Sequence, residues 1–259
     1  LSLSLSIFQV QRKYVYTLRQ LILTGDNQSC SQHIHQYMQA VADEIIFNNS
    51  DPKKHPRNWN LEKLLKEFST VGGKLFRDHF SKITDEELLR SVLEAEKLDS
   101  IDVNDFGLPN MPKTPNAFLG IRSKNSLLRR WLSIRFDPIS KGGKHREAVN
   151  LLRKYFGDFL IALYVVSVKE SGFDEAYVGE AERSALLKTL DSFWRDHLVN
   201  MNRLSSAVNV RSFGHRNPLE EYKIDGCRFF ISMLTATRKS TLQSLFYHWS
   251  ASHPNDFYF

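Results

Sequence analysis

The feature that most constrains this sequence is a long apolar stripe between residues 187 and 208. Its members follow one another at alternating steps of three and four residues, which gives the period of about 3.5 of a helix packed lengthwise on a partner helix. The stripe consists of Leu187, Leu190, Trp194, His197, Met201, Leu204 and Val208. Burial of each large side chain would contribute on the order of 1.5–3 kcal/mol. The spacing therefore predicts a long helix that is buried along one face.

A second helix is expected to begin at Pro218 and to supply the partner for this stripe. Asn217 is a suitable N-cap, Pro218 fits the first helical position, and Glu220 stands where a capping-box carboxylate belongs. The apolar residues of this helix are Tyr222, Phe229, Phe230, Met233, Leu234, Leu242, Leu245 and Phe246. Because the connection is short, the two helices should form an antiparallel hairpin.

The segment between these two helices combines an aromatic side chain with basic ones. Phe213 stands beside Gly214, and Arg211, His215 and Arg216 flank the pair. An exposed ring on a stiff stem would suit transient contact with varied, unfolded polypeptides. The pattern equally allows Phe213 to fold back onto a neighbouring helix, so both placements stay open.

The rest of the chain also has the periodicity of helices and contains no convincing pair of strands. Further helices are expected over residues 9–24, 31–48, 61–68, 84–98, 126–136 and 145–170, and the two hairpin helices over 174–210 and 218–249. Gly72 and Gly73 are expected to break the third of these. The predicted fold class is therefore all-α.

Composition is that of an ordinary soluble globular protein, but the charge is uneven. The net charge of +6 is too small to indicate a nucleic-acid partner. Residues 113–154 carry eleven Lys or Arg side chains against two acidic ones. This block could contact an anionic membrane surface, or it could be a solvated insertion. The candidate surface residues are Arg129, Arg130, Lys141 and Lys144.

Neither the cysteines nor the histidines are spaced as a metal or catalytic site. Cys30 and Cys227 form no CxxC pair, which fits a reducing compartment. Cys227 is expected to be a small buried residue of the second hairpin helix. His197 lies on the apolar stripe, where a hydrogen-bonded core histidine is expected rather than a ligand or base. No catalytic residue and no metal ligand is predicted.

Nucleotide chemistry has no support in the sequence either. A phosphate-binding loop needs the spacing GxxxxGK[ST], and neither Gly72-Gly73-Lys74 nor Gly142-Gly143-Lys144 has it. The chain alone is therefore expected neither to bind nor to hydrolyse ATP. A free-standing enzyme has no supporting residues.

The two hairpin helices resemble the two-helix finger of SecA, the protein-translocase motor. The residues that match its LDxxWxxHLxxMxxL…LR…P…EYK pattern are Leu190, Asp191, Trp194, His197, Leu198, Met201, Leu204, Arg211, Pro218, Glu221, Tyr222 and Lys223, with Glu182 and Arg183 upstream. Near the start, Gln11, Arg12, Val15, Tyr16 and Arg19 are similar to the QRxxIYxxR segment of the SecA scaffold helix. Residues 59–68 and the acidic stretch after Thr84 resemble its helical wing.

The resemblance implies a domain organisation. Residues 9–29 would end the long scaffold helix, residues 30–173 would form the wing with a basic insertion at about 107–145, and residues 174–250 would form the finger. The flanking stretches would be a non-native-looking start, residues 1–8, and a tail, residues 251–259. No nucleotide-binding domain is expected within the chain, although the full-length family uses ATP and magnesium.

The resemblance also implies a function and partners. In the full motor the fingertip, here Arg211, Phe213, His215 and Arg216, would contact a preprotein that enters a Sec-type membrane channel. Ser205, Ala207 and Phe213 depart from the usual Arg, Gly and Tyr of the family. This drift resembles a divergent plastid branch, which would place the protein in the chloroplast stroma and at a membrane; otherwise it would be cytoplasmic and peripheral. The alternative is a non-motor helical adaptor that binds a protein partner or an anionic membrane.

Overall fold

The computed structural model describes the chain as a set of α-helices. It describes residues 2–51, 53–54, 58–82, 143–211 and 218–251, without the side chains of 2–6, 81–82, 143–148, 151, 208–211 and 218. Its helices are α1 (Ser2–Thr24), α2 (Asn27–Asn49), α3 (Leu61–Lys82), α6 (Gly143–Ser171), α7 (Glu175–Arg211) and α8 (Pro218–Ala251). No strand occurs within these ranges, so the predicted all-α class is confirmed.

The helices are divided between two compact units. Unit 1 comprises Leu1–Ile34 and Phe173–Leu245, and unit 2 comprises His35–Gly172 and Phe246–Phe259. Unit 1 therefore contains α1, the first turns of α2, α7 and most of α8. Unit 2 contains the rest of α2, α3, α6 and the last turns of α8.

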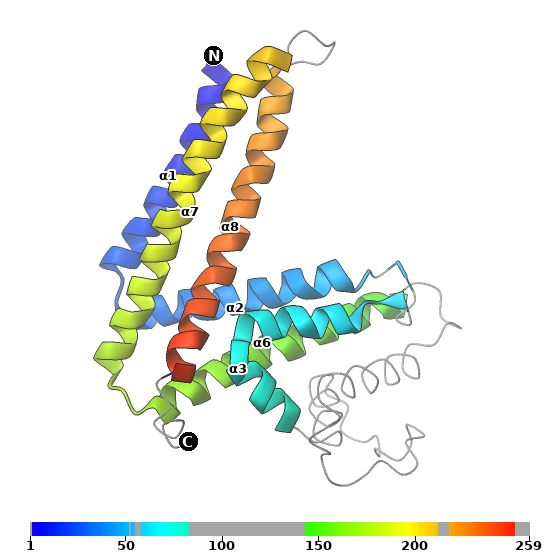
Figure 1. Cartoon of the computed structure of the whole chain (residues 1–259), viewed down its shortest axis with the longest axis vertical. Helices are drawn as coiled ribbons and strands as arrows, with labels where there is room; N and C mark the ends of the chain where they lie inside the picture. The colour runs from blue at the N-terminus through cyan, green and yellow to red at the C-terminus, as the bar shows by residue number, and fades with distance from the viewer. Residues whose placement is uncertain (1, 52, 55–57, 83–142, 212–217, 252–259) are drawn as a thin grey trace. The chain divides into compact units, whose positions relative to one another are not determined.

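In unit 1, α1 and α7 pack along each other, and α8 runs beside α7 (Figure 1). The hydroxyl groups of Thr189 on α7 and Thr241 on α8 are 2.6 Å apart, which ties the two hairpin helices together far from their connection. The connection itself, residues 212–217, lies outside the described residues.

Capping side chains explain where several helices begin. Asp26 accepts hydrogen bonds from the backbone and hydroxyl of Ser29, so α2 begins at Asn27, earlier than the predicted Ser31. Asn60 caps α3 as predicted, because the backbone N–H of Lys63 donates to its Oδ1 atom at 3.0 Å. Asp174 caps α7 in the same way through the N–H of Tyr177.

Two further helices, α1 and α3, differ from their predicted bounds. The α1 helix begins at Ser2 rather than Gln9, so the alternating Leu and Ser residues at the start of the chain are helical. The break predicted at Gly72 and Gly73 is confirmed, because Gly73 is non-helical, with a φ of 58° in the left-handed region that suits glycine. The α3 helix nevertheless passes the predicted end at Phe68, changes direction at Gly73 and continues to Lys82 (Figure 1). Buried residues beyond the kink, among them Phe76 and Phe80, explain why the helix resumes.

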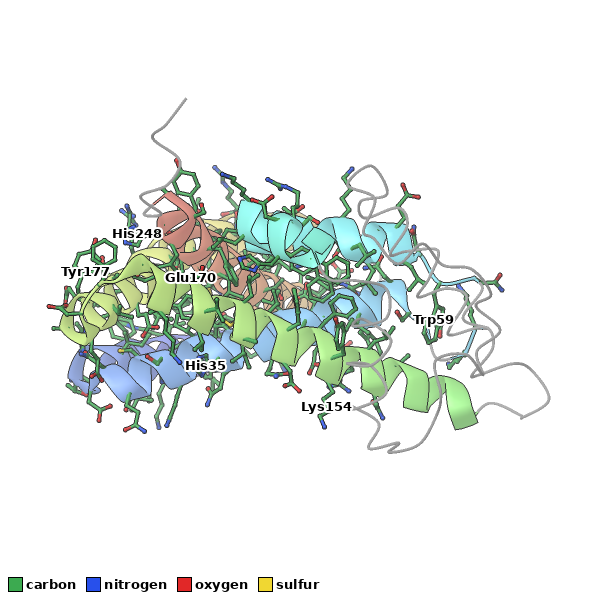
Figure 2. All side chains as sticks on the ribbon, turned by 90° about the horizontal axis from the view of Figure 1, so that it is seen from below. His35, Trp59, Lys154, Glu170, Tyr177 and His248 are labelled. Atoms are coloured by element: carbon green, nitrogen blue, oxygen red, sulfur yellow. The ribbon has the colours of Figure 1, made fainter. Side chains whose placement is uncertain are left out.

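The core of unit 2 is aromatic. Phe156 on α6 stacks on Phe68 of α3 with ring centroids 4.5 Å apart, and Phe76 stacks on Phe80 at 5.2 Å. At one end of the unit Trp59 closes the connection between α2 and α3 by donating from Nε1 to the carbonyl of Asp51 (Figure 2).

The basic block of the sequence falls mostly outside the described residues. So do the helices predicted over 84–98 and 126–136. Figure 2 shows the exposed Lys154 of this block pointing away from α6. Among the described helices, none combines the length and the apolar character that crossing a membrane requires.

Candidate functional site

The predicted apolar stripe forms a buried face of α7. Its buried members are Leu190, Trp194, His197, Met201 and Leu204. Leu187 is only half-buried, and its neighbour Leu186 takes the buried position in that turn. Val208 lies in the last turns of α7, where the side chains are not described.

The stripe packs on α1 as well as on α8, which the sequence reasoning did not foresee. Phe8 of α1 stacks on Trp194 with ring centroids 6.2 Å apart. Near the other end of the stripe, Met201 and Leu204 form a buried cluster to which Phe8 and Tyr222 add half-buried rings. The stripe is thus the centre of a three-helix contact.

The partner stripe predicted on α8 is only partly correct. Met233, Leu242, Leu245 and Phe246 are buried, but Phe229 is 39% exposed and does not belong to a core. Its neighbour Phe230 instead meets Tyr14 of α1 edge to face, at 5.8 Å between ring centroids. A helix with partners on two sides presents a broader apolar face than a single stripe indicates.

One buried glutamine joins all three helices of this contact. Gln11 of α1 is 4% exposed, and its Oε1 atom lies 2.9 Å from Nε2 of His197 on α7. Its Nε2 atom donates to the carbonyl oxygen of Gly226 on α8 at 3.1 Å. A Cβ atom on residue 226 would lie 3.0 Å from the methyl carbon of Met201, so glycine there permits the close approach of α8 to α7.

The contact fixes the tautomer of His197. Because the amide nitrogen of Gln11 donates to Gly226, its oxygen faces the imidazole, and Nε2 of the neutral ring must carry the hydrogen. His197 is 2% exposed, and its Nδ1 atom has no hydrogen-bond partner. Burial lowers the pKa of His197, so the neutral ring is favoured.

An ion pair continues the α1–α7 contact beyond the glutamine. Arg19 donates from Nε to Oδ1 of Asp191 at 2.9 Å and from Nη2 to Oδ2 at 3.2 Å, a two-point geometry. The hydrogen bond and charge of Asp191 raise the pKa of Arg19. Both side chains are 42% exposed, so solvent screens the pair.

A third polar contact holds the end of α1. Arg183 of α7 donates from Nη1 to the carbonyl oxygens of Ile22 and Leu23, which belong to the last turn of α1 and have no partner within that helix. The adjacent Glu182 is buried and accepts a hydrogen bond from the hydroxyl of Ser31 at 2.6 Å. Together these contacts fix α1 and α2 against α7.

The predicted fingertip and basic surface lie largely beyond the described part of the chain. Phe213, His215 and Arg216 fall in residues 212–217, and Arg129, Arg130 and Lys141 fall in residues 83–142. Arg211 is the last residue of α7 and Lys144 lies in the first turn of α6, but neither side chain is described.

The prediction that Cys227 is buried is wrong. Its thiol is exposed on α8, because the buried position of that turn is taken by Gly226 next to Met201. Cys30 is buried, and desolvation raises the pKa of its thiol. Across the described residues, no three His, Cys, Asp or Glu side chains gather in a way that could hold a metal ion.

Sequence reasoning on apolar periodicity could not identify the polar contacts. A stripe of large side chains says nothing of Gln11 or Arg19, which belong to a different helix. Gln11 and Arg19 match the scaffold-helix segment of the family, and Asp191 and His197 match its finger. The two motifs are separate in sequence, and only the structure joins their residues.

Comparisons with known proteins identify one family. The family model described as the SecA Wing and Scaffold domain matches residues 6–249. The chain is 62% identical over 245 residues to the protein translocase subunit SECA2, chloroplastic, of Arabidopsis thaliana, which covers 95% of this chain and 23% of that protein. It is 27% identical over 239 residues to the protein translocase subunit SecA of Synechococcus sp. (strain JA-3-3Ab), covering 91% of this chain and 18% of that protein.

A third relative is more distant. The protein translocase subunit SecA of Syntrophobacter fumaroxidans is 23% identical over 241 residues, covering 93% of this chain and 21% of that protein. No solved structure shows significant similarity to the chain. The chain spans less than a quarter of the length of these relatives. The family match over residues 6–249 shows that the chain belongs to the SecA wing and scaffold domain family.

Proposed function

We propose that this chain is the wing and scaffold part of an ATP-driven preprotein translocase, in which the α7–α8 hairpin passes motion to a translocating polypeptide. The observation that carries the proposal is the contact of α1 with both hairpin helices through Gln11. Unit 1 thereby contains one helix, α1, that packs on a pair of long antiparallel helices, α7 and α8, which residues 212–217 connect. The names of the relatives support the same task.

The energy source would lie outside the described helices. The chain lacks the spacing of a phosphate-binding loop, so ATP and magnesium would be bound by other parts of the full-length protein. Within this chain the work is mechanical. Displacement of α1 would move the hairpin through the buried contact, and the hairpin would carry its connecting segment with it.

The partners follow from the same proposal. The preprotein would meet the fingertip residues Arg211, Phe213, His215 and Arg216, and the hairpin would work at a Sec-type channel. The basic residues Arg129, Arg130, Lys141 and Lys144 would contact an anionic membrane surface near that channel. The similarity to a chloroplastic relative supports a plastid, where the protein would act in the stroma and at a membrane.

The test of this function is a fingertip substitution in the full-length protein. Phe213→Ala should leave the thermal unfolding unchanged and reduce the amount of preprotein moved into membrane vesicles that carry the channel. Phe229→Ala is the matched control, because this ring is exposed on α8 and should affect neither measurement. Equal translocation by the wild type, Phe213→Ala and Phe229→Ala would contradict the role of the fingertip.

The sequence of the transcript would distinguish the proposed translocase function from the alternative function as a non-motor helical adaptor. An open reading frame upstream of Gln9 that encodes nucleotide-binding motifs would identify the chain as part of a motor. An initiation codon immediately upstream, with no such motifs, would favour a helical adaptor that binds a protein partner or an anionic membrane without hydrolysing ATP.

A further inference from the structure

We infer that Gln11 is a positioning residue that holds the α7–α8 hairpin in one register against α1. The inference concerns the buried polar contact among Gln11, His197 and the carbonyl of Gly226. His197 lies 186 positions after Gln11 along the chain, and Gly226 lies 215 positions after it. Its consequence for transport rests on the function proposed above. The positioning itself does not, and it can be measured separately.

The geometry of the contact allows little sliding. Both hydrogen bonds of Gln11 are near their normal lengths, 2.9 and 3.1 Å, and such bonds weaken steeply once the atoms separate further. A helix rises about 1.5 Å per residue, so displacement of α1 by one residue would break both bonds. Because both polar groups of Gln11 are engaged, any slip leaves a buried donor and a buried acceptor without partners.

No neighbouring register offers replacements for both bonds. One turn along the buried face of α7, His197 is followed by Met201, which has no hydrogen-bond donor, and preceded by Trp194, whose only polar group is the indole N–H. Trp194 could donate to Oε1 of Gln11, but that alignment would move Nε2 of Gln11 away from the carbonyl of Gly226. On α1 the positions one turn away from Gln11 are occupied by Phe8 and Val15, which are apolar. The polar groups therefore match in one alignment of the two helices.

The apolar contacts cannot fix the register of these helices alone. Phe8, Trp194, Met201 and Leu204 gain from burial in any alignment that keeps them out of water, because the hydrophobic effect has no direction. A single buried polar residue fixes the register of packed helices in coiled coils, at some cost in stability. Gln11 is placed to do the same here, and its bond to Gly226 extends the constraint to α8.

The test separates positioning from stability. Gln11→Met keeps the length of the side chain but leaves the Nε2–H group of His197 without an acceptor, so the Tm should fall. Combining it with His197→Phe removes both polar groups and keeps a ring between Trp194 and Phe230. Because both partners are then apolar, the double variant should regain the Tm of the wild type.

Register is measured in the full-length protein with a pair of spin labels. Cys227 is exposed on α8 and Lys13 is exposed on α1, so labels on Cys227 and on Lys13→Cys report the alignment of these helices. Cys30 is buried and would stay unlabelled; accessible cysteines elsewhere in the full-length protein are replaced. Gln9→Met is the matched control, since Gln9 is exposed on the same helix.

We expect the distance distribution to be narrow in the wild type and in Gln9→Met. It should be broad or shifted in Gln11→Met and in the double variant, although the latter regains its Tm. A narrow, unshifted distribution in the double variant would overturn the inference, because apolar packing would then suffice to set the register.

The same variants test the consequence for transport. The amount of preprotein moved per ATP hydrolysed should fall about two-fold or more in Gln11→Met and in the double variant, and stay unchanged in Gln9→Met. Unchanged coupling despite a broadened distribution would overturn the claim that this register transmits motion. If the wild type moves no preprotein at all, the proposed function fails, while the distance measurement still decides the positioning.

Discussion

The core of unit 2 is built from aromatic rings, whereas the contact among α1, α7 and α8 in unit 1 carries buried polar side chains. In unit 2, Phe156 lies between Phe68 and Phe80, with centroids 4.5 and 6.1 Å away. In unit 1, Gln11 and His197 are also buried, and their side chains are hydrogen-bonded to each other. Two helical packings in one chain thus use different chemistry.

The difference affects how strictly each core fixes the alignment of its helices. Stacked rings bury much apolar area and stabilise any arrangement that keeps them together, so they suit a unit that must simply hold its shape. Buried hydrogen bonds contribute less net free energy, but they are satisfied in one geometry only. Unit 1 therefore has the chemistry of a packing with one preferred alignment, which is what the proposed function requires.

The largest expected effect lies in the ring core. Phe156→Ala should lower the free energy of unfolding by about 3–5 kcal/mol, because the cavity it leaves borders several large side chains that cannot all move in. Phe47→Ala is the control, since this ring is 67% exposed on α2 and its loss should change the free energy by less than about 0.5 kcal/mol. Urea unfolding followed by circular dichroism measures both. Similar losses of unfolding free energy in the two variants would contradict the burial of Phe156 in the aromatic core of unit 2.

The apolar part of the unit 1 contact should give the next largest effect. Leu190 is fully buried, and Leu190→Ala should cost about 2–5 kcal/mol. Met201→Ala should fall in the same range, with a smaller cost if flexible neighbours fill the space. The matched control is Val199→Ala, which removes an exposed side chain from the same helix. A midpoint of urea unfolding that barely moves in the Leu190 variant would show that α7 does not bury this face.

Much of the fold was accessible from local patterns. The 3–4 spacing on α7, the Asn60 cap and the start of α8 at Pro218 are properties of short segments, and the structure has them where they were expected. The break expected at Gly72 and Gly73 is present, because Gly73 has a non-helical conformation. The second helical segment, which continues to Lys82, was missed, because the burial of its rings depends on contacts with other segments.

The candidate site was accessible only in part, because its contacts join distant segments. The stripe on α7 predicts that something covers it, but periodicity cannot say that α1 does so. Gln11 is one of several glutamines in the first helix, and only its position opposite His197 distinguishes it. Cys227 was assigned to the buried face because small residues pack well, whereas Gly226 occupies that position.

The pH dependence of stability should distinguish the polar contact from the ring core. Burial lowers the pKa of His197 below the ordinary value of 6.5, so the unfolded chain binds a proton there more readily than the folded chain. This contribution to stability is complete above pH 6.5 and is lost as the pH falls through the lower pKa of the folded state. In urea titrations at pH 7.5 and 5.5, the wild type should lose more stability than the double variant Gln11→Met/His197→Phe. An equal loss in the two proteins would show that His197 is not the group responsible.

The smallest effect should come from the ion pair that accompanies the polar contact. Arg19 and Asp191 make three hydrogen bonds, yet both side chains are 42% exposed, so solvent screening should keep their net contribution to stability small. The pair is measured by a double-mutant cycle of Arg19→Met and Asp191→Asn at low and high salt, with Asp196→Asn as the exposed control on α7. The coupling energy should shrink as salt rises. A coupling energy that is large and independent of salt would instead place this pair, rather than the buried glutamine, among the contacts that align α1 with the hairpin.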